Sequence, residues 1–258
     1  MQLTEWMDNM EAIAPRALAL DYDNPGLNIA PMHTDIRRVL VALDLTVPVA
    51  EEAAAWGADL VLTHHPLFFH GMKHLTYDDP DTAAAMLLVR GGIGHFSAHT
   101  NLDAAEGGVN DVLAGLIGLA GVEPFGEDGI GRVGNVDTVR PMTLADFAAL
   151  CEERLHCTAL ATGDADTRIS RVAVLGGAGG DELAAARQAG ADLFITGECK
   201  HHQALAAEVL GLCVLTCGHY ETERPVLDVL VNRLQTKEND VQYRVALADR
   251  SPQRRIRR

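Results

Sequence analysis

The sequence predicts an α/β fold made of two similar lobes. Apolar runs of strand length alternate with helix-like segments, which is typical of β-α-β units with largely parallel or mixed sheets. From Val39 to Thr63 the first half also aligns on the second without a gap. An offset of 133 residues places Val39 over Val172 and superposes the sequence Gly-Ala-Asp-Leu at 57–60 on the same sequence at 190–193. We therefore expect two pseudo-symmetric lobes.

The first lobe is predicted to span residues 1–125. Pro48 can begin a helix and Gly57 can end it, whereas Pro66 ends a strand because it has no N–H for the ladder. The apolar runs suit strands that are buried on both faces. Strands are expected at 38–45, 60–63 and 93–98, and helices at 3–14, 51–56, 81–90 and 109–119, with a turn-rich segment at 22–27.

The second lobe is predicted to span residues 126–258, after a glycine-rich stretch at 121–134. Strands and helices alternate as before, so a second sheet is expected. The segment 248–258 could instead pack on the first lobe. Strands are expected at 172–175, 193–196, 212–216 and 241–247, and helices at 144–155, 181–189, 203–210 and 225–234.

Composition limits the class of protein. Of the 258 residues, 48% are hydrophobic and 22% are charged, which is ordinary for a globular chain. No run of about 18 apolar residues occurs, so no membrane span is expected. The formal net charge of −15 argues against nucleic acid as a partner, because such binding depends on Lys and Arg that neutralise phosphates.

The N-terminus and the cysteines indicate the compartment. The first residues show no basic region followed by an apolar core, so no secretory signal is expected. The chain has five cysteines, an odd number, and no C-x-x-C sequence. We expect a cytoplasmic protein with reduced thiols.

Histidines and acidic residues follow the predicted strands in both lobes. A second offset, of 120 residues, superposes the His-x-x-x-Asp that begins at His99 on the His-x-x-x-Glu that begins at His219. Open α/β sheets bind ligands at the carboxyl ends of their strands, so the matched residues predict a metal site in the cleft between the lobes. They are His64, His65, His99 and Asp103 in the first lobe, and Glu198, His202, His219 and Glu223 in the second.

These side chains offer nitrogen and carboxylate oxygen ligands without a thiolate, which suits Zn²⁺, Fe²⁺, Mn²⁺ or Co²⁺. Two adjacent histidines whose side chains diverge from one strand end suit two ions better than one. Paired ions hold the attacking and the leaving oxygen and lower the pKa of a water molecule. Hydrolysis is therefore the expected chemistry.

Three of the matched residues are candidates for catalytic roles. His99 and Glu198 could hold a metal-binding imidazole in place or act as general acid or base, and His202 could orient a substrate. Each of the three could also be purely structural. The histidines that lack this context, and that we interpret as ordinary surface or core residues, are His33, His70, His74, His95 and His156.

Two further segments have open roles. Residues 176–180 (Gly-Gly-Ala-Gly-Gly) lie between a strand and a helix, so their N–H groups could hold a phosphate, although such turns are common without a ligand. The basic tail at 254–258 could contact an anion or another subunit, or could be a solvated end.

Six motifs that occur in order resemble the Nif-three-like family of dinuclear-metal proteins, often called GTP cyclohydrolase 1 type 2 homologues. Together they span nearly the whole chain, although Glu198 stands where the family often has Asp and Tyr22 where it often has Trp. The motifs are YDNPGL at 22–27, THHPL at 63–67, HTNLD at 99–103, GGVND at 107–111, Gly-Glu with a later His at 197–202, and Gly-His with a later Glu at 218–223.

The resemblance implies two divalent metal ions per subunit in a two-lobed α/β protein. It also implies a toroidal homohexamer whose metal sites face an internal cavity. The metal ligands that it implies are His64, His65, Asp103, His219 and Glu223.

Together these features predict a metal-dependent hydrolase, cyclohydrolase-like or phosphoesterase-like. It would act on a small polar or nucleotide-like substrate through a metal-activated water. A non-enzymatic alternative stays open, in which the chain handles metal ions or is an interaction module whose ions hold the lobes together. The two hypotheses differ in whether the metal-loaded protein catalyses a reaction that a substitution could abolish.

Overall fold

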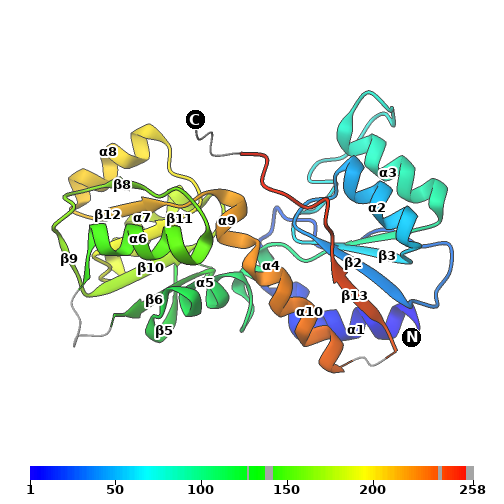
Figure 1. Cartoon of the computed structure of the whole chain (residues 1–258), viewed down its shortest axis with the longest axis horizontal. Helices are drawn as coiled ribbons and strands as arrows, with labels where there is room; N and C mark the ends of the chain where they lie inside the picture. The colour runs from blue at the N-terminus through cyan, green and yellow to red at the C-terminus, as the bar shows by residue number, and fades with distance from the viewer. Residues whose placement is uncertain (127, 137–141, 238–239, 254–258) are drawn as a thin grey trace. The chain divides into compact units, whose positions relative to one another are not determined.

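The computed structural model describes residues 1–126, 128–136, 142–237 and 240–253, so the basic tail at 254–258 lies outside the described residues. The chain divides into two compact units. The first contains Met1–Glu106 and Leu227–Arg250, and the second contains Gly107–Val226 and the segment that begins at Ser251. Each unit has its own mixed sheet, which confirms the predicted two-lobed α/β fold (Figure 1). None of the helices in the described ranges is long and apolar enough to cross a membrane.

The sheet of the first unit is built on four parallel neighbours. Over the described residues its strand order is β1-β4-β3-β2-β13, with β1 antiparallel to β4 and β13 parallel to β2. The strands are β1 (Gly26–Ile29), β2 (Arg38–Ala42), β3 (Leu60–Thr63), β4 (Gly94–Ser97) and β13 (Gln242–Val245). The helices are α1 (Leu3–Ile13), the 3-10 helix η1 (Arg16–Leu18), α2 (Val47–Trp56), α3 (Pro80–Gly91), α4 (Thr100–Ala104) and, from Leu227 onward, α10 (Pro225–Lys237).

The strands of the first sheet are buried on both faces, which explains their continuous apolar runs. Leu40 and Val61 pack in one hydrophobic cluster with α2 and α3. On the other face, Trp6 of α1 meets Phe96 edge-on with 5.2 Å between ring centroids, and its indole N–H donates to the Tyr243 hydroxyl (2.8 Å). Figure 1 shows α2 and α3 on the side of this sheet opposite to α1.

The sheet of the second unit is larger. Within the described ranges its order is β5-β6-β10-β11-β12-β8, with β10, β11 and β12 parallel and with β6 and β8 antiparallel to their neighbours. The strands are β5 (Ala120–Phe125), β6 (Gly131–Asn135), β8 (Leu160–Thr162), β10 (Arg171–Leu175), β11 (Leu193–Thr196) and β12 (Cys213–Thr216), and β7 (Met142–Thr143) pairs separately with β9 (Arg168–Ile169). The helices are α5 (Val109–Ile117), α6 (Leu144–Leu155), η2 (Gly179–Glu182), α7 (Leu183–Gln188), α8 (His201–Leu210) and α9 (His219–Glu223).

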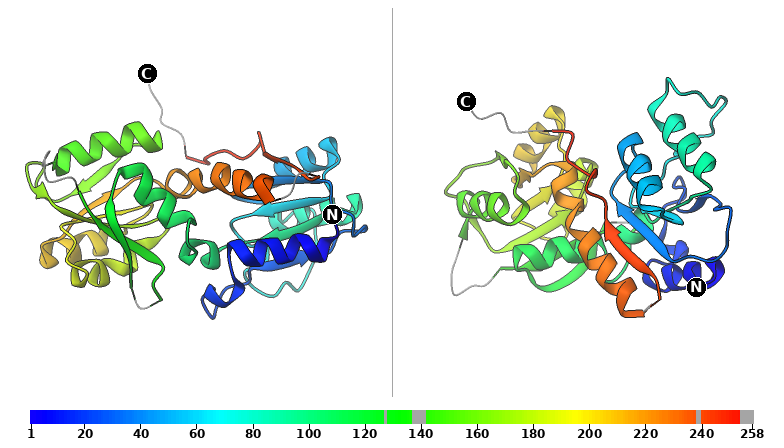
Figure 2. Two further views of the ribbon diagram at one scale, coloured as in Figure 1. Left: turned by 90° about the horizontal axis from the view of Figure 1, so that it is seen from below. Right: turned by 45° about the vertical axis from the view of Figure 1, so that its right-hand side comes forward.

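Helices cover both faces of the second sheet. Val174 and Ile195 pack with apolar residues of α5 and α6, whereas Ala173 and Phe194, which point the other way, pack with those of α7 and α8. In the left view of Figure 2, α6 (green) and α8 (yellow) lie on opposite sides of this sheet. The sheet is therefore the central layer of the second unit.

The internal repeat extends to the register of the strands. Val39 pairs with Leu60 in the first sheet, and Val172 pairs with Leu193 in the second, so the offset of 133 residues is kept across both strand pairs. The next three pairs along each ladder follow the same offset. The duplication read from the sequence is thus a duplication of structure.

The repeat also includes one pattern of hydrogen bonds between an aspartate side chain and the backbone. In the first unit, the carboxylate of Asp59 accepts from the backbone N–H groups of Arg37 and Arg38, each at 2.8 Å. In the second, Asp192 accepts from the corresponding N–H groups of residues 170 and 171, at 2.9 and 3.0 Å. Each carboxylate satisfies two donors at the start of a central strand.

The edges of the sheets depart from the sequence-based division. The strand expected at 241–247, in the second lobe, is β13 and pairs with β2 in the first sheet. Residues 107–125, expected in the first lobe, form α5 and β5 of the second unit. The repeat contains β2, β3 and β4 of the first sheet and β10, β11 and β12 of the second, so it carries no information about which strand joins an edge.

Candidate metal centre

Two adjacent histidines follow β3 at the point where the chain leaves the sheet. The hydroxyl of Thr63, the last residue of β3, donates to the carbonyl of His65 (2.6 Å) and accepts from Nε2 of His95 (2.8 Å). On a regular strand the rings of His64 and His65 would point to opposite faces. Here the backbone turns after the strand, and the two ring centroids are 4.9 Å apart.

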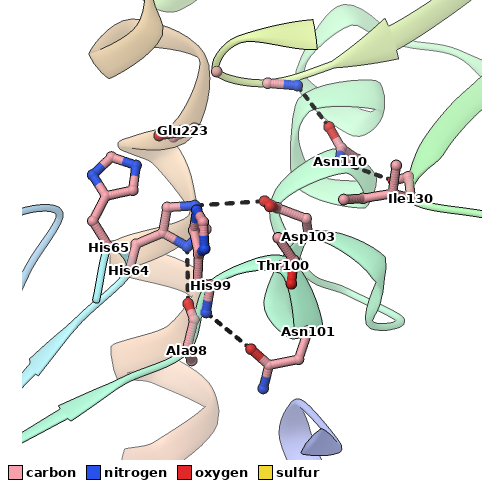
Figure 3. Close-up of polar contacts among 12 residues, drawn as sticks. His64, His65, Ala98, His99, Thr100, Asn101, Asp103, Asn110, Ile130 and Glu223 are labelled. Carbon is pink, nitrogen blue, oxygen red and sulfur yellow. Dashed lines mark hydrogen bonds and ion pairs between the residues drawn. The ribbon is translucent and has the colours of Figure 1, made fainter. Parts of the chain in front are cut away.

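His99 follows β4 and begins the short helix α4. Its backbone N–H donates to the side chain of Asn101 (2.9 Å), and its carbonyl accepts from the N–H of Asp103 (3.0 Å). This single turn directs the carboxylate of Asp103 toward His64, with 3.5 Å between Oδ1 and Nε2 (Figure 3). The predicted His-x-x-x-Asp motif is therefore a helical turn with both ends at the candidate site.

Three imidazoles of the first unit form a cluster. The ring of His99 lies 5.2 Å from that of His64 and 5.5 Å from that of His65, measured between centroids. Each ring offers a nitrogen, and the three nitrogens lie within 4.8 Å of one another. This spacing allows more than one of them to bind the same ion.

The hydrogen bonds of these rings select the tautomer that a metal requires. Nδ1 of His64 faces the carbonyl of Ala98 (2.9 Å), and Nδ1 of His65 faces the carboxylate of Asp44 (2.8 Å). A carbonyl or an ionised carboxylate can only accept, so Nδ1 carries the hydrogen and Nε2 has the lone pair. Metal-binding histidines almost always donate their other N–H in this way.

The carboxylate of Asp23 accepts the Nδ1 hydrogen of His99 in the same way. Its carboxylate lies 2.8 Å from Nδ1 of His99 and also accepts from the backbone N–H and the hydroxyl of Thr100, at 3.0 and 2.5 Å. Burial alone would raise the pKa of Asp23, but the hydrogen bonds from His99 and Thr100 outweigh it and lower the pKa to about 2. Asp23 therefore stays ionised and keeps the hydrogen on Nδ1 of His99.

The second unit contains a corresponding turn. His219 and Glu223 lie at the two ends of α9, one helical turn apart, with 3.2 Å between Nε2 and Oε2. The carboxylate of Glu198, from the segment after β11, lies 2.9 Å from Nδ1 of His219. The carboxylate of Glu223 is buried, whereas His219 is partly exposed. Glu198 thus holds His219 as Asp44 holds His65.

The glycine-rich loop makes room for this pair. Gly177 has a φ of +64°, and a Cβ there would lie 2.1 Å from Oε1 of Glu223 and 3.1 Å from Nε2 of His219. Three of the loop's N–H groups are bonded within the unit: those of Gly176, Gly177 and Gly179 donate to Asn110 (2.8 Å), Thr222 (3.0 Å) and Thr196 (3.0 Å). These three donors are not free for a phosphate, and phosphate binding by the loop stays a prediction.

The remaining predicted residue, His202, is exposed in the first turn of α8, and no hydrogen bond or ion pair joins its side chain to another residue that the structure describes. Beside Glu198 and His219 the second unit has an open cavity of about 840 Å³, which Lys200 and Cys217 also line. The roles assigned to His99, Glu198 and His202 stay predictions, as does the ligand set.

Sequence reasoning did not single out Asp23 and Asp44. Asp44 comes two residues after β2, as His65 and His99 come two residues after β3 and β4, and this place in the chain was a usable signal. Asp23 follows no strand end. It meets His99 through tertiary contact alone, across 76 residues of sequence, so it could be found only as part of the YDNPGL motif.

These observations define a class: an α/β protein of two related units whose strand ends present imidazoles and carboxylates suited to divalent metal ions. The family model of Duf34/NIF3 (NGG1p interacting factor 3) matches residues 1–253. The chain therefore belongs to the Duf34/NIF3 family.

Curated relatives match over most of their length. A protein of Clostridium perfringens described as "GTP cyclohydrolase 1 type 2 homolog" is 34% identical over 98% of both chains. One of Nostoc sp. with the same description is 38% identical over 92% of both. A "Protein NIF3 homolog" of Schizosaccharomyces pombe is 36% identical over 87% of this chain and 86% of its own.

Solved structures share the fold. A Bacillus cereus protein related to NIF3 superposes with a TM-score of 0.91 over 99% of both chains at 23% identity, a likeness that concerns the fold alone. Reduced HcgD from Methanocaldococcus jannaschii superposes with a TM-score of 0.83 over 95% of this chain and 97% of its own, at 29% identity.

Proposed function

We propose that this chain binds two divalent metal ions and is a metal-dependent hydrolase for a small polar or nucleotide-like substrate. One observation carries the proposal: in four histidines, Nδ1 is held by an oxygen acceptor, which leaves Nε2 as a lone-pair donor. The description of several relatives as GTP cyclohydrolase 1 type 2 homologs supports a nucleotide-like substrate. The four histidines are His64, His65, His99 and His219.

The proposed centre takes ligands from both units. Nitrogen and carboxylate donors without a thiolate suit Zn²⁺, Fe²⁺, Mn²⁺ or Co²⁺. Each unit supplies an imidazole and a carboxylate on a single helical turn, and the family resemblance supports one shared centre. The proposed ligands are His64, His65, Asp103, His219 and Glu223. From the family resemblance we also propose a homohexamer, and from the odd number of cysteines without a C-x-x-C sequence we propose a cytoplasmic protein.

The chain's own residues would position the reaction. When bound, divalent ions polarise a phosphoryl or carbonyl oxygen and lower the pKa of water. Asp44 and Glu198 would fix the rings of His65 and His219 in place. His99 is the candidate for moving a proton at its Nε2, because Asp23 holds the hydrogen on its Nδ1 and would stabilise the imidazolium.

Metal content tests the shared centre. We expect the purified protein, reloaded with Zn²⁺, Mn²⁺ or Fe²⁺, to hold about two ions per chain by elemental analysis. His65→Ala and Glu223→Ala should each lose both ions, because each ligand serves the same centre. His33→Ala and Glu208→Ala, which change an exposed histidine and an exposed glutamate, are the matched controls and should keep them.

Two outcomes would contradict the proposed metal centre. If the wild-type chain holds no metal after reloading, the metal site itself is refuted. If His65→Ala loses one ion and keeps the other while Glu223→Ala does the reverse, each unit binds its own ion and the shared centre is refuted.

Activity assays test the proposed hydrolase function. The metal-loaded protein should hydrolyse a member of a panel of nucleotides and phosphoesters, and His99→Gln should lower kcat by about 10²- to 10⁴-fold while the metal content stays full. Loss of metal in His99→Gln would instead make His99 a ligand. A fully metal-loaded wild type that hydrolyses nothing in the panel would refute the hydrolase and favour the metal-handling alternative.

A further inference from the structure

Exposed aromatic side chains gather beside the histidine cluster of the first unit. Only 5% of the residues are aromatic, and those exposed in the described part of the chain are Tyr22, Phe69 and Tyr77. The ring of Phe69 lies 6.1 Å from that of His99 and 6.0 Å from that of Tyr22. Two of the three exposed aromatic residues are thus next to the candidate metal centre.

The two rings are held by contacts that also build the site. Tyr22 immediately precedes Asp23, which bonds to His99. The side-chain amide of Asn24 donates to the carbonyl of Phe68 (2.7 Å), so it ties the segment of Tyr22 to the segment of Phe69. The carbonyl of Asn24 in turn accepts from the buried hydroxyl of Ser97 (3.3 Å), at the end of β4. The sheet therefore anchors both aromatic segments.

Both rings keep exposed surface, and none of the ring contacts of Phe69 is a parallel stack. The ring plane of Phe69 lies at 83° to that of His70, at 80° to that of His99 and at 50° to that of Tyr22. Tyr22 is 63% exposed and Phe69 is 42% exposed. Exposed apolar surface next to a polar site is typical of a ligand-binding surface, and accessible aromatic faces suit a flat ring.

We propose that Tyr22 and Phe69 form an aromatic platform that stacks the planar heteroaromatic ring of the substrate. The inference rests on the proposed function, because it names the part of the substrate that lies beyond the metal ligands. Stacking there places the rest of the substrate toward His99, whose ring Phe69 contacts. A substrate without a flat ring gains nothing from these faces, so the platform selects for heteroaromatic compounds such as nucleotides.

Binding of two probes that differ only in the ring tests the platform. We expect metal-loaded protein to bind GMP more tightly than ribose 5-phosphate in titration calorimetry. Phe69→Leu and Tyr22→Leu should each weaken GMP binding by about 5- to 100-fold, the range measured for loss of one base–aromatic stack. The dissociation constant of ribose 5-phosphate should stay the same in both variants.

Controls separate stacking from loss of structure. Tyr22→Phe keeps the ring and should restore GMP binding. Tyr77→Leu removes an exposed tyrosine that makes no ring contact with any residue in the described ranges, and it should change nothing. Metal content should equal that of the wild type in all variants. Equal affinity for GMP and ribose 5-phosphate, or unchanged GMP binding in Phe69→Leu and Tyr22→Leu, would overturn the proposal.

The result of the GMP-binding experiment does not depend on whether the protein hydrolyses a substrate. If GMP binding depends on the two rings but no substrate is hydrolysed, the platform stands and the hydrolase is refuted. If hydrolysis is found while the Leu variants bind GMP like the wild type, the hydrolase stands and the platform is refuted.

Discussion

At the scale of residues, the candidate centre depends on hydrogen bonds from Nδ1 of its histidines, the nitrogen that would not bind a metal ion. The acceptors of the Nδ1 hydrogens are a backbone carbonyl for His64 and carboxylates for His65, His99 and His219. Each bond fixes a ring orientation before any ligand arrives. Outer partners of this kind change metal affinity by about 10- to 100-fold when they are removed.

Gly177 offers the sharpest test of this packing. Gly177→Ala would place a Cβ 2.1 Å from Oε1 of Glu223, so we expect metal binding to be lost and the free energy of unfolding to fall by about 2–3 kcal/mol. Gly211 is the matched control, because its φ of +63° imposes the same backbone strain with nothing within 4 Å of the added Cβ. Gly211→Ala should cost about 1 kcal/mol and leave metal binding intact.

Denaturant titration and elemental analysis of the two variants measure these effects. Equal losses of stability, with metal retained in both, would mean that the carboxylate of Glu223 moves aside freely and that the glycine is needed only for its backbone angle.

At the scale of elements, β3 and β4 are linked by a buried histidine. His95 of β4 donates from Nε2 to the hydroxyl of Thr63, which in turn bonds to the carbonyl of His65. Burial disfavours the charged imidazole and lowers the pKa of His95 to about 3. The strand that carries the histidine pair is therefore supported by a ring that must stay neutral.

This link predicts a pH dependence of stability. The pKa of His95 in the folded protein is below its unfolded value of about 6.5, so its effect is absent above pH 6.5. As the pH falls toward 3, the unfolded chain binds a proton that the folded chain does not, and the free energy of unfolding falls by about 1.4 kcal/mol per pH unit.

His95→Gln keeps a donor for Thr63 and removes the titration. Denaturant titrations between pH 4 and 7 should give the variant a shallower loss of stability than the wild type. Equal slopes would show that other groups cause the loss and that His95 is charged in the folded protein.

At the scale of the whole molecule, the sequence predicts the centre of each sheet better than its edges. The parallel strands are continuous apolar runs, and the repeat carries their register, so β2, β3, β10 and β11 lie close to where they are expected. Edge strands such as β13 and β5 are only partly apolar and partly buried, and tertiary pairing alone assigns them to a sheet.

The residues of the candidate site likewise divide into those that the sequence predicts and those that it does not. His64, His65 and the two helical turns at His99 and His219 could be predicted because they follow strand ends in both halves. Asp23 could not, because it reaches His99 from a turn with no periodic pattern. Sequence reasoning therefore finds side chains that the repeat aligns, and misses partners that only the folded backbone brings near.

The position of β13 has a consequence for the nascent chain. About 200 residues separate Ala42, which ends β2, from Gln242, which begins β13. At a synthesis rate of about 5–20 residues per second, β2 remains an unpaired edge for about 10–40 seconds after it leaves the ribosome. Almost all of the second unit emerges during that wait, up to Val226. The half of the protein that starts later in the sequence can thus finish folding first, and the last strand to be made closes the sheet that was begun first.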